Sequence, residues 1–279
     1  MSSQKRNEEY EFLVLLDFSK ASYIALKYVI NLAKIINLKI NILHVIDVGK
    51  KKNKTDLISN ESAESVVKAK LSSIVDIIEE EGIHVSSTYI KGSVNDEIKK
   101  HLLKYRLNDK IVVIGKSKNN TKVLGNTVSY LLHEYSGTLL VVGEEREFHH
   151  DSKLSVGSNG KHLKRSDLQV LFDLDRYTTH PLSVLNIENH NETEPFEIVD
   201  FPKVNLSFDD ENLSFEYLKS STVAHGLIEH IYKEAIDLFC IGREKTDSSL
   251  INLFINKNST ISKIVKATNI PILIVGGTS

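Results

Sequence analysis

Short apolar runs alternate with longer amphipathic stretches along the first half of the chain. Apolar runs of this length predict buried strands, and apolar residues spaced three and four apart predict helices. The predicted strands are EFLVLLD (11–17), KINILHVI (39–46), HVSSTYIKG (84–92), KIVVIG (110–115) and GTLLVVG (137–143). The predicted helices lie between them, at 18–37, 61–82, 93–108 and 127–136. This alternation predicts a parallel, doubly wound α/β sheet.

The second half of the chain repeats the order of segments found in the first. The matched pairs are LHVI and LNIE, YIKGS and YLKSS, IVVIGKSK and LFCIGREK, and TLLVVG and PILIVG. Four matches in the same order indicate a tandem duplication, which divides the chain into domains at 1–147 and 152–279. We therefore predict two Rossmann-like domains, each a five-stranded parallel sheet flanked by helices. The stretch 191–214 has no helical period, so we expect the helix there to be short or absent.

The composition and net charge of the chain exclude few classes of function. The 279 residues are 41% hydrophobic and 26% charged, with a formal net charge of −2, which gives no global argument for binding nucleic acid or a membrane surface. The basic run KKKNK (50–54) reads as a solvated loop or as a docking patch. The single cysteine, Cys240, lies in the apolar run LFCIG and reads as a core residue. With no apolar leader or spanning segment, we expect a cytoplasmic protein without a membrane partner.

Candidate chemistry gathers where the first-half strands end. The loops after Asp17, Ile46 and Gly115 should share the carboxyl edge of the sheet, where doubly wound folds hold ligands. The stretch GKSKNNTKVLGNTVS (115–129) separates a strand from a helix, which is a common place for phosphate.

Each of these residues also has a purely structural interpretation. Ser19 is a plausible N-cap of the following helix, and Asp17 can also cap it through its side chain. Gly115 and Gly242 each begin a turn after a strand, where glycine is favoured for backbone reasons alone. The polar residues at the predicted helix starts can be caps: Asn126, Thr127, Ser129, Ser259, Thr260 and Ser262.

Three segments resemble the universal stress protein family, and in particular its tandem two-domain form common in Bacteroidetes-type bacteria. They are LLDFSKASYIALKYVINLAKIINLKINILHVI, GSVNDEI, and KIVVIG followed by GNTVSYLLHEYSGTLLVV. The resemblance implies an adenine nucleotide alpha hydrolase-like fold and pairing through the last strand. Some family members bind ATP through an acid after the first strand and a glycine-rich loop after the fourth.

The resemblance places a nucleotide site in the first repeat. The residues it assigns to the adenine part are Asp17, Phe18, Ser19 and Val45. Those it assigns to the phosphate part are Gly115, Lys118, Gly125, Asn126, Thr127 and Val128. Lys118 replaces the middle glycine of the family loop, the following spacer is three residues short, and Asn126 replaces a hydroxyl residue. We therefore expect a degenerate site at which ATP or another adenine nucleotide binds weakly or no longer binds.

The second repeat departs further from the family pattern. Ser158 or Asn159 replaces the acid, and Lys245 replaces the middle glycine. The weaker candidates that remain are Gly242, Ser259 and Thr260. The apolar residues within 250–255 suggest packing against the other repeat.

The expected function is a cytoplasmic stress-response or regulatory module. Two alternatives stay open: a functional ATP- or AMP-binding stress protein, and a ligand-free structural or interaction module. No catalytic constellation is present in the sequence, so we expect no enzyme, with slow ATP hydrolysis as the least favoured option. His149 and His150 lack further ligands at a metal spacing, so we expect no metal. The expected partners are the two repeats for each other, a second copy of the chain, and an unidentified regulatory protein.

Overall fold

The fold is described from a computed structural model of the chain. The described residues are 10–48, 57–106, 109–117, 124–157, 168–189, 213–243 and 259–276, with the backbone alone described at 57–62 and 188–189. The basic run 50–54, Lys118, Lys245 and the stretch 250–255 lie outside this part of the chain.

The first half alternates strands and helices as the apolar pattern predicts. Its elements are β1 (Glu11–Leu15), α1 (Lys20–Ile36), β2 (Ile40–Asp47), α2 (Leu57–Glu80), β3 (Val85–Gly92), α3 (Val94–Leu102), β4 (Lys110–Gly115), α4 (Asn126–Glu134) and β5 (Leu139–Val142). The helix predicted to reach residue 108 ends at Leu102. The helix predicted from residue 61 begins at Leu57, and past its end Gly82 takes a φ of 79°, a conformation that glycine adopts readily.

The second half contributes five more strands. Its elements are β6 (Leu154–Gly157), α5 (Gln169–Asp175), β7 (Leu182–Asn189), β8 (Leu213–Ser220), α6 (Val223–Lys233), β9 (Leu238–Gly242), α8 (Thr260–Ala267) and β10 (Ile272–Val275). The expectation of a short or absent helix before β8 falls on residues outside the described ones.

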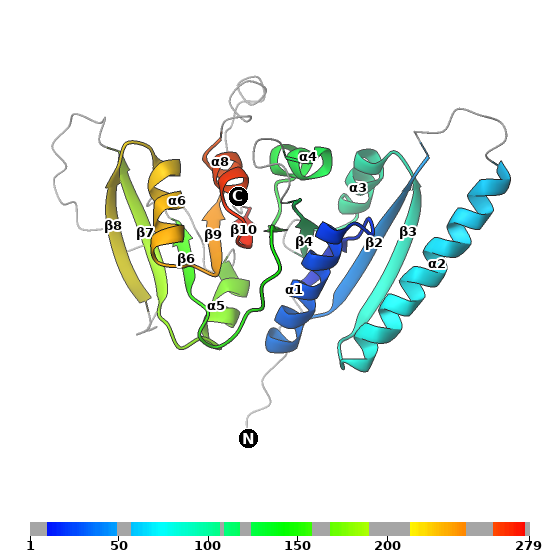
Figure 1. The fold of residues 1–279 in the computed structure, drawn as a ribbon, viewed down its shortest axis with the longest axis horizontal. Helices are drawn as coiled ribbons and strands as arrows, with labels where there is room; N and C mark the ends of the chain where they lie inside the picture. Colours follow the sequence, from blue (N-terminus) through cyan, green and yellow to red (C-terminus); the bar gives the residue numbers. More distant parts are fainter. Residues whose placement is uncertain are drawn as a thin grey trace.

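The ten strands of the described residues belong to one continuous sheet, in the order β3-β2-β1-β4-β5-β10-β9-β6-β7-β8. Figure 1 shows the two halves side by side. Neighbouring strands within each half are parallel, whereas β5 and β10 pair antiparallel, with Leu140 opposite Leu273. The predicted α/β class with a mostly parallel sheet is therefore confirmed. The two five-stranded sheets are joined at their last strands within one chain.

Helices cover both faces of the sheet. One hydrophobic core lies between the sheet and α1, α2 and α5, and the other lies between the sheet and α3, α4, α6 and α8. Successive strand residues alternate between the two cores, as Phe12 and Leu13 do. Cys240 is fully buried in the first core, and burial raises the pKa of its thiol. Its interpretation as a core residue is confirmed.

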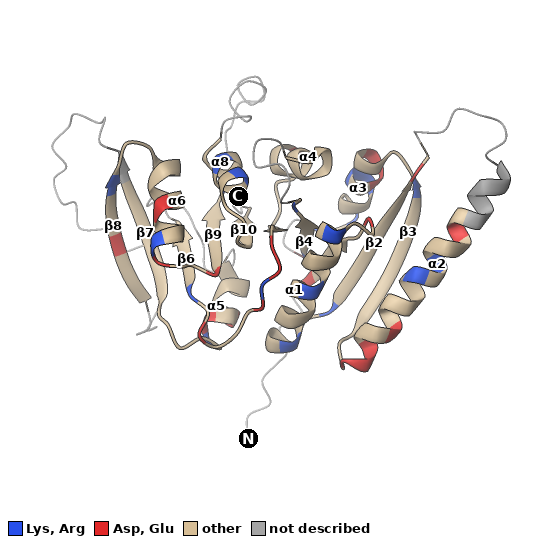
Figure 2. Cartoon of the chain, in the orientation of Figure 1, with Lys and Arg blue, Asp and Glu red and all other residues tan. Residues whose placement is uncertain are grey.

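Lys and Arg residues and Asp and Glu residues are interspersed along the helices and strands of both halves (Figure 2). Within the described residues, no helix is both long and apolar enough to cross a lipid bilayer.

Candidate functional site

The carboxyl edge of the first half is formed by the ends of the neighbouring strands β2, β1 and β4. Strand order reverses between β1 and β4, which is the position where doubly wound sheets hold ligands. Asp17, Gly115 and the last residues of β2 therefore reach the same edge, as predicted.

Asp17 organises the start of α1. Its Oδ1 accepts a hydrogen bond from the Ser19 amide at 2.9 Å, and the Ser19 hydroxyl oxygen in turn accepts one from the Ser22 amide at 3.2 Å. Partial burial raises the pKa of Asp17, but hydrogen bonds from Ser19 and Ser22 outweigh this effect and hold the pKa below its ordinary value. The carboxylate is thus ionised at neutral pH and supports the helix start. Ser19 is the N-cap of α1, as predicted, whereas Asp17 is not the cap and instead binds the amide of the cap residue. Ligand contact by Asp17 stays a prediction.

Phe18 lies between Asp17 and Ser19 in the left-handed backbone region, with a φ of 60°. Its ring centroid is 4.5 Å from that of His44, and the Lys70 ammonium lies 5.1 Å from the ring centroid. The ring packs against the core under α1 and α2, whereas the Val45 side chain packs against the opposite core. The two predicted adenine-binding side chains therefore lie on opposite faces of the sheet.

Gly115 is required by the packing of α1 on β4. A Cβ atom at this position would lie 2.1 Å from the carbonyl oxygen of Ala21. Because that neighbour is backbone, it has little freedom to move away. The predicted structural role of Gly115 therefore has a specific cause, which is close contact with the first turn of α1.

The start of α4 differs from the predicted arrangement of caps. Gly125 is the N-cap residue, while Asn126 and Thr127 occupy the first two helical positions. The interpretation of Asn126 and Thr127 as caps is wrong, because the helix begins one residue earlier than its apolar period suggests. Val128 is buried in the core, so its backbone alone can reach a ligand. Gly125 and Asn126 are exposed.

The first turn of α8 in the second half is capped by a side chain of the same segment. Ser259 is the N-cap, and its hydroxyl oxygen accepts a hydrogen bond from the Ser262 amide at 3.2 Å. The capping interpretation is confirmed for Ser259, whereas Thr260 is the first helical residue. Gly242 ends β9, and Ser158 and Asn159 lie outside the described residues.

Two cations that were not singled out from the sequence follow β4 and β9 directly: Lys116, which is buried, and Arg243, which is half-buried. Lys116 donates from Nζ to the carbonyl oxygens of Val265 and Thr268, and Arg243 donates from its guanidinium to those of Leu131 and Leu132. Each cation therefore contacts the opposite half of the chain. The available signal was the cation after the glycine in both IVVIGKSK and LFCIGREK.

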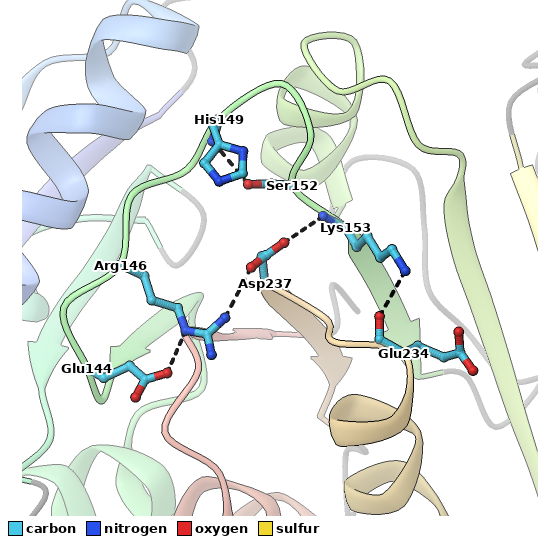
Figure 3. Close-up of polar contacts among 7 residues, drawn as sticks. All are labelled: Glu144, Arg146, His149, Ser152, Lys153, Glu234 and Asp237. Atoms are coloured by element: carbon cyan, nitrogen blue, oxygen red, sulfur yellow. Dashed lines mark hydrogen bonds and ion pairs between the residues drawn. The ribbon is translucent and has the colours of Figure 1, made fainter.

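A polar network fixes the connection between the halves (Figure 3). Arg146 contacts Glu144 at 2.5 Å and Asp237 at 3.1 Å, and Asp237 also accepts from the Lys153 amide at 2.9 Å. The His149 amide donates to the Ser152 hydroxyl at 3.0 Å. Among the described residues, no group of three or more His, Cys, Asp or Glu side chains is placed to hold a metal.

Comparison with known proteins identifies a family to which the first half of the chain is similar. Residues 11–143 match the model of the Universal stress protein family. The first half of the chain is therefore similar to a universal stress protein domain. The tandem form suggested by the sequence stays a prediction. No curated protein matches the chain.

Solved structures extend the likeness to both halves. A universal stress protein from Archaeoglobus fulgidus superposes with a TM-score of 0.74 at 15% identity, covering 96% of this chain and 98% of that one. A protein of unknown function from Pseudomonas aeruginosa PAO1 gives a TM-score of 0.67 at 14% identity, covering 96% and 92%. The cytoplasmic domain of a prokaryotic cation chloride cotransporter gives 0.55 at 10% identity, covering 95% of each chain. At these identities the likeness concerns the fold.

Proposed function

We propose that the whole chain is a universal stress protein that acts as a regulatory module, with a degenerate adenine-nucleotide site at the carboxyl edge of its first half. Occupancy of this site would change contacts between the protein and a regulatory partner. The proposal includes no catalytic step and no metal.

The observation that carries the proposal is the difference between the two equivalent helix starts. Gly125 has no side chain, so the cap residue leaves the first amide groups of α4 available to an anion. Ser259 uses its hydroxyl to accept from the first turn of α8. The site is therefore proposed in the first half, near the ionised Asp17.

A ligand-free module is the second candidate, and specific contacts favour it. The fold itself accounts for Gly115 through its contact with Ala21, for Asp17 through its hydrogen bond to Ser19, and for Phe18 through its packing on His44. A functional ATP- or AMP-binding protein would in addition need the loop backbone to approach the phosphates closely. Lys118, in place of the family's middle glycine, makes this close approach less favourable.

Isothermal titration of the purified chain with ATP, ADP and AMP separates these candidates. The proposal expects weak binding of at least one nucleotide. It also expects Gly125→Ser to reduce this binding, because the new hydroxyl would compete for the helix amides. The matched variant Ser259→Gly removes the equivalent cap in the second half and should leave first-half binding unchanged. No heat and no thermal shift with any of the three nucleotides would support the ligand-free module.

A further inference from the structure

Lys116 carries a positive charge from the end of β4 across to the second half. Its side chain is buried, with 7% exposure. The ammonium donates to the carbonyl oxygens of Val265 at 2.6 Å and Thr268 at 2.5 Å. These carbonyls belong to the C-terminal end of α8, where helices carry unpaired acceptors and a partial negative charge.

Arg243 makes the reciprocal connection from the end of β9. Its Nη1 and Nη2 donate to the carbonyl oxygens of Leu132 at 3.0 Å and Leu131 at 3.3 Å, near the C-terminal end of α4. Each half thus supplies one cation, at the same position after its fourth strand, to the last helix of the other half.

Each backbone contact beside Lys116 has an equivalent contact beside Arg243. The Lys116 amide donates to the Val142 carbonyl at 2.7 Å, and the Arg243 amide donates to the Val275 carbonyl at 2.9 Å. The glycines that follow β5 and β10 lie against the other half: a Cβ on Gly143 would lie 2.6 Å from the Asn269 carbonyl oxygen, and one on Gly276 would lie 2.0 Å from that of Ser136. The backbones of the two halves are therefore in close contact at this joint.

Removing these two cations partly or wholly from water is favourable only while their contacts with the opposite half are in place. Burial lowers the pKa of Lys116 to about 8 and that of Arg243 to about 10, which reflects the cost of removing each charge from water. The Glu144 charge, in the same half, raises the pKa of Lys116 in part. The helix-end carbonyls that also offset the cost belong to the opposite half. Moving either strand end would take the charged group away from its carbonyl partners on the opposite half.

We propose that Lys116 and Arg243 form a reciprocal latch, through which the end of the fourth strand in each half controls the last helix of the other half. Because Lys116 directly follows Gly115, any shift at the carboxyl edge of the first half reaches α8 and β10. The latch does not depend on which ligand, if any, occupies that edge.

Hydrogen exchange of the full chain, without ligand, tests the latch. Lys116→Met should speed exchange in peptides covering 264–275 of the second half about tenfold or more, as expected for lost hydrogen bonds to a charged group. Arg243→Met should do the same for residues 131–142 of the first half. Lys27→Met, which removes an exposed cation paired with Glu145, is the matched control and should leave both regions unchanged.

Conservative variants keep the test decisive if either methionine variant fails to fold. Lys116→Arg and Arg243→Lys retain the charge, so they should fold and preserve most of the protection across the joint. The proposal is overturned if exchange changes only in the half that carries the substitution, or if it rises equally in all peptides. It is also overturned if protection across the joint is lost to the same extent in the charge-retaining variants.

Discussion

His230 illustrates how a buried polar side chain shapes stability without facing solvent. It lies on α6 with 2% exposure, its Nε2 is 3.4 Å from the Ser155 hydroxyl, and its Nδ1 is 3.6 Å from a Glu216 carboxylate oxygen. Desolvation lowers the pKa of His230 more than the Glu216 charge raises it. The native state therefore favours the neutral imidazole. His101, at the equivalent turn of α3, has its pKa lowered by burial as well.

We predict that His230→Gln makes stability less sensitive to acid. Because the native pKa lies below the unfolded value of about 6.5, the unfolded chain binds the proton first as the pH falls, and the native state loses stability. The free energy of unfolding in urea, measured at about pH 7.5 and about pH 5, should differ less in the variant than in the parent chain. His84→Gln, at an exposed position beside β3, is the control and should keep the parent's difference. An unchanged difference in His230→Gln would contradict the assigned role.

The structural role of a residue could be predicted from the sequence where its hydrogen-bond partner lies nearby in the chain. Asp17 and Ser19 were expected to support a helix start because the relevant amides are two and three residues away. Lys116 and Arg243 were missed because their acceptors lie more than one hundred residues away. No local period encodes such a contact. Phe18 and Val45 were grouped by family resemblance, but their side chains pack against opposite cores.

At the scale of elements, the apolar pattern located every described strand of the first half. Continuous buried runs such as that of β4 leave little ambiguity, because both faces of the sheet are covered. Helix ends were less well predicted. The start of α4 was placed one residue late because Asn126 and Thr127 resemble caps, whereas Gly125 takes that position. The close approach of α1 to β4 was also hidden, since a glycine after a strand has several possible causes.

We predict that Gly115→Ala destabilises the chain by about 1–3 kcal/mol, as overpacking of a close contact does. The new methyl group would collide with the backbone of Ala21 and push α1 away from β4. Gly125→Ala is the matched control, because a Cβ there meets nothing within 4 Å. It should cost less than about 1 kcal/mol through the poorer N-cap. Urea unfolding of both variants measures the difference, and equal losses would contradict the packing explanation.

At the scale of the whole molecule, three features of the described residues join the halves in addition to the contacts of Lys116 and Arg243. The sheet is continuous through β5 and β10, the α1 side is linked by a hydrogen bond of 2.6 Å from Tyr10 to Asp173, and the connecting segment is fixed to Asp237 through Arg146. The apolar pattern predicted two similar five-stranded units. Periodicity alone contained no information on how those units meet, because β5 and β10 read as equivalent buried strands.

We predict that both halves unfold in one cooperative transition. The chain contains no tryptophan, so Tyr23→Trp on α1 and Tyr232→Trp on α6 each introduce a single fluorescent probe at an exposed position. Unfolding one half alone would expose the apolar faces and the strand edge that β5 and β10 share, so a half-folded state should be poorly populated. Urea curves from the two probes should therefore have the same midpoint. Far-ultraviolet circular dichroism of each variant supplies a probe of the whole chain, and its midpoint should coincide with that of the fluorescence. Two separated midpoints, with one half melting first, would show that the joint at β5 and β10 does not couple the halves.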